Sequence, residues 1–223
     1  MKLKLSLSIV FLMSAACLPA QDFMLPREGF FPGTLHYKNG KVREVFVSAP
    51  KHTKQGTIII RATKTAKKEK VPSASLDSIS ITPRKGITHY FEHLPWYYKK
   101  GGNPKKAMWF YVTIKGYATL YLWYETFIID RNGNATDVSY TTQGSGIVYT
   151  YMLRKKNEKS AVYFAHVPSH TLAIGFNAAL KRAATLYLSE DKDLVDKINK
   201  KLLKTEDLEE IINIYNDFMS QRK

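Results

Sequence analysis

Hydrophobic and polar residues alternate with a period of two along the first part of the chain, which is typical of half-buried β-strands. Two alternating stretches flank Asn39-Gly40, a pair that favours a type I′ turn, so we expect a β-hairpin there. Further strands are expected over 57–63 and 73–82. Residues 21–85 are therefore predicted to form a small N-terminal antiparallel β segment.

A second antiparallel β segment is predicted over residues 86–168. Its turn-bounded strands are Ala107–Lys115, Tyr117–Asp130, Ala135–Thr142, Ile147–Lys155 and Ser160–His166. Residues 117–129 are apolar on both faces, so this strand is expected to be central and covered on both sides. Residues 83–106 hold prolines and glycines around aromatic residues, which predicts an irregular crossing and a boundary between the two segments.

The period changes to that of an amphipathic helix in the last part of the chain, 169–223. Apolar residues recur at helical spacing in three stretches that are separated near Ser189 and Thr205, both predicted as N-caps. The order of elements, strands first and helices last, predicts an α+β fold. We expect an antiparallel, barrel-like body in two β segments and a C-terminal tail of about three helices.

The N-terminus has the pattern of a secretory signal peptide over residues 1–20. Lys2 and Lys4 precede an apolar stretch that is too short to span a bilayer, and small residues lead to Ala20. We therefore expect an exported protein, periplasmic or at the cell surface, without a transmembrane helix in the mature chain. The alternative is a lipoprotein anchored through Cys17, because Ser14-Ala15-Ala16 gives this single cysteine the context of an acylation site.

The charge balance suggests a class of partner. The formal net charge is +15, and removal of Lys2 and Lys4 with the leader lowers it to +13. A charge of this size attracts polyanions, and an anionic envelope polymer, lipid headgroups or another envelope protein are the expected partners. The alternative is that the lysines only keep the protein in solution. The candidate basic and aromatic face consists of Lys67, Lys68, Lys99, Lys100, Lys105, Lys106, Trp96 and Tyr97.

One catalytic pattern is present, the H-x-x-E-H spacing of His89, Glu92 and His93. On a helix, two such histidines bind zinc while the glutamate acts as general base. Gly86 and Pro95 leave barely one turn for a helix, so an extended segment is favoured, and neither a metal nor a cofactor is predicted. A non-enzymatic envelope module is the main hypothesis, and a zinc-dependent envelope hydrolase is the alternative.

A third hypothesis is a structural subunit of a larger assembly. It expects an exposed apolar patch around Tyr215 and Phe218 on the helical tail.

Several segments also resemble a group of secreted bacterial proteins of unknown function. The resemblance is carried by the strand and turn at 33–40, by 58–60 and 71–76, by Gly116–Tyr121 and by Ile211–Asn216. It implies export and a β-rich body with a helical tail. No catalytic motif is among these segments, so the resemblance implies no functional residue.

Overall fold

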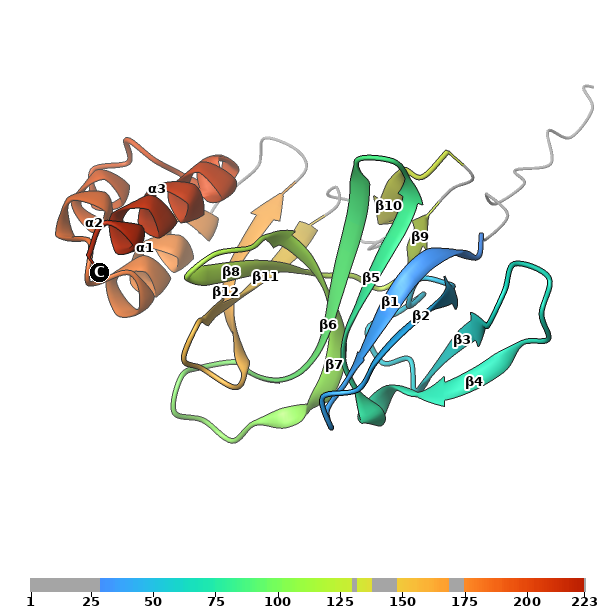
Figure 1. Ribbon diagram of the computed structural model, residues 1–223. Helices are drawn as coiled ribbons and strands as arrows, with labels where there is room; N and C mark the ends of the chain where they lie inside the picture. The colour runs from blue at the N-terminus through green and yellow to red at the C-terminus, as the bar shows by residue number, and fades with distance from the viewer. Residues whose placement is uncertain (1–28, 130–131, 138–147, 169–174, 223) are drawn as a thin grey trace, which may run out of the picture.

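The computed structural model of the protein describes residues 29–129, 132–137, 148–168 and 175–222. Within these ranges, ten strands form one sheet, two short strands form a second, and three helices follow (Figure 1). The predicted α+β class with a helical C-terminal tail is confirmed. The leader, Cys17 and the expected strand residues 138–142 lie outside the described residues.

The first five strands follow each other as a small curved sheet in the order β5-β1-β2-β3-β4. Their bounds are Phe31–Tyr37 (β1), Val42–Val47 (β2), Thr57–Arg61 (β3), Glu69–Pro72 (β4) and Leu76–Arg84 (β5), with a 3-10 turn at Ser73–Ser75. The predicted hairpin is β1–β2. Its turn differs from the expected type I′, because only Gly40 has a positive φ, 82°, and its N–H donates to Tyr37 O. This is a type I turn followed by a left-handed glycine.

The next strands form a ring. They are Ile87–Tyr97 (β6), Lys105–Ile114 (β7), Ala118–Trp123 (β8), Val148–Lys155 (β11) and Ala161–Pro168 (β12), while Phe127–Ile129 (β9) and Ala135–Asp137 (β10) pair separately. β12 pairs with β11 and also, in parallel, with β6, which closes the five strands on themselves (Figure 1). The prediction of an irregular crossing over 83–106 is wrong, since β6 occupies its centre. The expected strand 117–130 is two strands, β8 and β9.

β5 and β6 are antiparallel neighbours, so the two predicted segments join in one continuous sheet. Side chains on opposite faces of β6 and β7 pack into two different cores, because successive side chains of a strand alternate in direction. Phe91 and Trp109 face the first core, which also contains Leu35, Ile60 and Ile79. The residues that point the other way fill the ring; this ring core consists of Trp96, Met108, Phe110, Val112, Tyr121, Met152 and Ala161.

Three helices cover the outer face of the ring, as Figure 1 shows. They are Phe176–Tyr187 (α1), Lys192–Asn199 (α2) and Leu208–Ser220 (α3). They pack on the outward side chains of β8, β11 and β12 in a third core. β8 is accordingly central and buried on both faces, as predicted. Within the described ranges, none of the helices is long and apolar enough to cross a bilayer.

Some details of the helical tail differ from the prediction. The N-cap of α2 is Asp191 rather than Ser189, and its side chain accepts from Leu194 N. Thr205 is fully buried at the start of a 3-10 turn and is not an N-cap. Tyr215 is fully buried against the ring, so the exposed patch expected around it is not formed.

Asn216 fastens α3 to the start of β8. Its amide donates to Ala118 O at 3.0 Å and accepts from Ala118 N at 2.7 Å, as a neighbouring strand would. Gly116 makes this approach possible, because a Cβ there would collide with the Asn216 side chain. The contact joins residues 98 positions apart in the sequence.

We expect Asn216→Ala to lower the free energy of unfolding by about 2 kcal/mol, since it leaves two part-buried backbone groups without partners. Urea unfolding followed by circular dichroism measures the change. The control is Asn213→Ala on the exposed side of the same helix, which is expected to be near neutral. Equal stability of the two variants would contradict the anchoring role of Asn216.

Candidate functional site

The lysines of the predicted basic face lie in two separate places. Lys67 and Lys68 are exposed in the β3–β4 loop, whereas Lys99, Lys100, Lys105 and Lys106 are exposed in the segment 98–106, which comprises the β6–β7 connection and the first two residues of β7 and is here called the lysine loop. Figure 1 shows the β3–β4 loop at the opposite end of the body from the lysine loop, which connects β6 to β7. The expectation of one shared basic face is therefore wrong, and two patches exist.

The predicted aromatic members of this face also separate. Trp96 is 5% exposed and belongs to the ring core, where its ring lies 4.9 Å from that of Trp123. Because side chains alternate along β6, Tyr97 points to the opposite, outer side and packs against the helix core. Trp96 cannot contact a surface ligand, whereas half-buried Tyr97 remains beside the lysine loop.

Glu92, the candidate general base, is held in an ion pair inside the ring. Its Oε2 lies 2.6 Å from Arg154 Nη2 and accepts from the Tyr121 hydroxyl at 2.8 Å. Burial, together with the Glu92 carboxylate, raises the pKa of Tyr121 well above its usual range. Arg154 Nε also donates to the Tyr121 hydroxyl. Glu92 Oε2, the Tyr121 hydroxyl and the two Arg154 nitrogens therefore bond to one another. The arrangement is structural.

The H-x-x-E-H motif lies on strand β6, which removes its zinc-binding geometry. His89 and His93 face the first core, about 13 Å apart at the usual strand rise, and Glu92 faces the ring. His89 contacts the Tyr111 hydroxyl at 3.1 Å and Gly133 O at 2.9 Å. Within the described ranges, no group of three or more His, Cys, Asp or Glu side chains is placed to hold a metal ion. The sequence expectation of an extended segment is confirmed.

His93 is buried in a place where its protonation is unfavourable. It is 8% exposed, its ring lies 5.0 Å from that of Trp109, and its Nδ1 has no hydrogen-bond partner in the described part of the chain. Burial, with a smaller contribution from Lys38, lowers the pKa of His93 to about 4. The neutral imidazole therefore belongs to the first core.

A cavity of about 220 Å³ lies under the lysine loop, between the ring and α1; we call it the junction cavity. Three parts of the chain that are far apart in the sequence line it: the end of β6 with the lysine loop, the β11–β12 turn with the start of β12, and the end of α1. The lining residues are Tyr97, Lys100, Gly101, Glu158, Lys159, Ser160, Val162 and Tyr187.

Lys100 connects these segments through its backbone and its side chain. Its N–H donates to the Tyr187 hydroxyl at 2.8 Å, and its Nζ lies 3.2 Å from Glu158 Oε1 and 5.6 Å from the Tyr187 ring centroid. Burial raises the pKa of Tyr187, so its hydroxyl stays protonated near neutral pH. The loop is also tightened by a turn in which Gly102 N donates to Lys99 O and Gly101 has a φ of 81°.

Sequence reasoning found Tyr97 and Lys100 of this cavity and missed the rest. Glu158 lies between the predicted strands Ile147–Lys155 and Ser160–His166, and Tyr187 lies in the predicted helical tail, 169–223. The sequence offered one signal for Glu158, namely its place in a lysine-rich connection between two predicted strands. Such a connection is expected to be exposed. Nothing in the sequence placed that turn beside the lysine loop.

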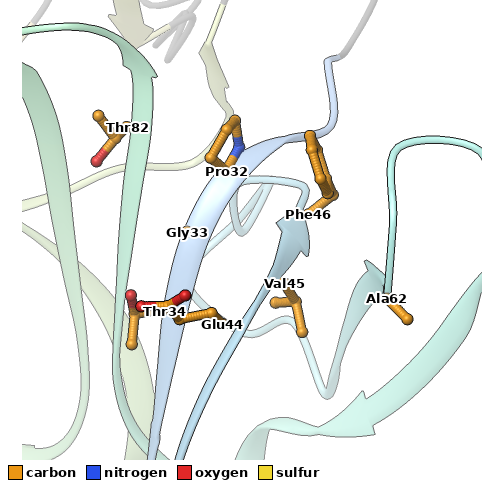
Figure 2. A pocket seen from close by; sticks show the side chains of 8 residues that line it. All are labelled: Pro32, Gly33, Thr34, Glu44, Val45, Phe46, Ala62 and Thr82. Atoms are coloured by element: carbon orange, nitrogen blue, oxygen red, sulfur yellow. The ribbon is translucent and has the colours of Figure 1, made fainter.

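A second hollow, of about 470 Å³, crosses the outer face of β1 and β2 (Figure 2). Pro32 and Phe46 lie at one side of it and Thr34 and Glu44 at the other, as Figure 2 shows; we call it the β1–β2 groove. Glu44 is the charged side chain of its lining, and the threonines supply hydroxyl groups. Such a lining fits a neutral or cationic polar ligand and disfavours an anion.

Comparison of the chain with protein-family models, curated proteins and solved structures finds no match.

The depressed pKa of His93 predicts acid sensitivity. The unfolded state binds a proton at His93 more readily than the folded state between about pH 4 and 6.5, so stability falls as pH falls through this window. We expect the free energy of unfolding to drop by about 2 kcal/mol more between pH 7 and 4.5 in the wild type than in His93→Gln.

Urea unfolding at a series of pH values measures this difference. His36→Gln, which replaces an exposed histidine of β1, is the matched control and is expected to keep the wild-type slope. A His93→Gln variant with the same pH slope as the wild type would show that His93 is accessible to protons in the folded state.

Proposed function

We propose that the mature chain is an exported, non-enzymatic binding module of the bacterial envelope whose lysine-rich end contacts an anionic component. The observation that carries the proposal is the gathering of Lys99, Lys100, Lys105 and Lys106 next to the β11–β12 turn with Lys156 and Lys159. Export rests on the leader pattern of residues 1–20. Acylation at Cys17 is the alternative route to the same surface.

The charge balance at this end supports attraction of an anion. The nearby carboxylate, Glu158, is paired with Lys100 at 3.2 Å, and the Lys155 Nζ–Glu190 Oε1 pair at 2.6 Å is held in the fold by the Tyr215 hydroxyl. Lys99, Lys106 and Lys156 are exposed and make no ion pair within the described residues. Such unpaired surface charges attract a polyanion, and salt screens them over about 10 Å at 0.1 M.

The lysine loop is a better candidate than the other lysine patch for a geometric reason. The β3–β4 loop carries Lys67 and Lys68, but its hairpin also carries Glu69, which is paired with Arg43 in two hydrogen bonds of 2.8 and 2.9 Å. Lys68 Nζ lies 5.9 Å from the Phe30 ring. Ala62 of this loop lines the β1–β2 groove, whose charged side chain is the carboxylate of Glu44, whereas the lysine loop covers the junction cavity, whose lining includes Lys100 and Lys159.

We expect the double variant Lys99→Glu/Lys106→Glu to lower affinity for anionic vesicles at least tenfold at low salt, because it reverses two charges in the binding patch. Co-sedimentation with phosphatidylglycerol vesicles measures the affinity, and phosphatidylcholine vesicles give the background. Wild-type binding is expected to weaken steeply as salt rises.

The matched control is Lys67→Glu/Lys68→Glu, which makes the same change in net charge at the other end of the body. It is expected to retain most of the binding. Equal losses in the two double variants would assign the attraction to net charge alone, and wild-type protein that ignores anionic vesicles at low salt would refute the proposal.

A further inference from the structure

We infer that the junction cavity is a binding subsite for a phosphodiester group. The inference rests on the proposed function, because it names the chemistry that the lysine-rich end would recognise. It goes further in assigning recognition to one cavity and to hydrogen-bond donors, in addition to the general attraction of exposed lysines.

The lining of the cavity offers more donors than acceptors. Lys100 and Lys159 contribute ammonium groups, and Ser160 contributes a hydroxyl that makes no hydrogen bond within the described residues. The Tyr187 hydroxyl accepts from Lys100 N, and its own proton has no acceptor in the described part of the chain. An oxyanion with several oxygens satisfies such a set of donors, because each oxygen accepts from more than one direction.

The net charge of the lining points to a singly charged group. Two ammonium groups, of Lys100 and Lys159, stand against the one carboxylate of Glu158, which leaves one positive charge. A phosphodiester carries one negative charge at neutral pH and balances this lining. A phosphomonoester carries close to two negative charges, so it would leave an excess of negative charge near Glu158.

The size of the cavity agrees with a group of this kind. A volume of about 220 Å³ is roughly seven times the share of one water molecule in the liquid. It has room for a phosphodiester and the first atoms on either side of it. Tyr97, Val162 and the Tyr187 ring supply apolar walls for those carbon atoms.

Burial makes the subsite different from the open lysine patch. Ser160 is 8% exposed and Tyr187 is 3% exposed, so hydrogen bonds to them form in a partly dehydrated setting. Hydrogen bonds to a charged group are stronger there than at the open surface, and salt screens them less. Occupation of the cavity should therefore persist at salt concentrations that weaken attraction by the exposed lysines.

The experiment is a titration of ¹⁵N-labelled protein, residues 21–223, with glycerophosphoglycerol, a soluble phosphodiester, followed by amide chemical shifts. Acetate at the same concentration is the control for a general anion. We expect shifts at Gly101 and Ser160 that saturate with the diester and not with acetate.

The matched pair of variants is Lys159→Gln and Lys67→Gln. Both remove one exposed lysine, but Lys159 lines the cavity, whereas Lys67 lies in the β3–β4 loop at the opposite end of the body. We expect Lys159→Gln to weaken diester binding at least fivefold and Lys67→Gln to change it less than twofold. Ser160→Ala, which removes one donor with little change of volume, is expected to weaken binding about threefold or more.

Failure of this inference and failure of the proposed function give different results. Equal losses in Lys159→Gln and Lys67→Gln, or diester shifts no different from those with acetate, would overturn the subsite even if anionic vesicles bind. Absence of both diester and vesicle binding at low salt would overturn both. If the diester binds in the cavity, its ability to displace the protein from phosphatidylglycerol vesicles identifies a lipid headgroup as the source, and occupation without displacement identifies a soluble diester.

Discussion

The double burial of β6 and β7 is the constraint on which the rest of the structure depends. Each strand sends alternate side chains into two different cores, so a slip of one residue would move every side chain to the wrong core. In β6, such a slip would place Glu92 in the apolar first core and remove it from Arg154. Leaving a buried charge unpaired is strongly destabilising, so the ion pair selects the correct register.

This arrangement also decides where binding chemistry is available. Two polar side chains of β6 are occupied within the fold: Glu92 contacts Arg154 and Tyr121, and His89 contacts Tyr111 and a backbone carbonyl. Unpaired charged groups remain at the strand ends, where the chain turns. The parallel pairing of β12 with β6 brings two of these ends together, and α1 closes the space between them.

Local sequence patterns predicted individual strands and turns better than they predicted which of these elements lie next to each other in the fold. The hairpin at Asn39-Gly40 and the double-sided burial of β8 were predictable, because turn chemistry and alternation act over a few residues. The prediction for the segment 83–106 was wrong, because its prolines and glycines are typical of a loop although the segment contains strand β6. Pro95 is tolerated in β6 where the pairing with β7 shifts register between Leu94 and Trp96.

The candidate site was harder to predict for the same reason. Lys100 and Tyr97 are recognisable as part of a basic and aromatic stretch, but Tyr187 is 87 residues away from the amide that it contacts. No spacing rule connects a loop to a distant helix end. The resemblance to secreted proteins and the export of the chain stay predictions.

Net charge alone was a poor guide to the binding surface, because it counts lysines and arginines that the fold uses. Arg154 and Lys155 are neighbours in the sequence, yet one pairs with Glu92 inside the ring and the other with Glu190 beside the helices. Charges fixed in this way are already balanced and add little to the attraction of a distant anion. Exposed lysines remain over much of the described surface, and of the two predicted patches only the lysine loop covers a cavity with buried hydroxyl groups. A phosphodiester held there would gain from charge and hydrogen bonding together, which is why position, more than the number of lysines, carries the functional argument.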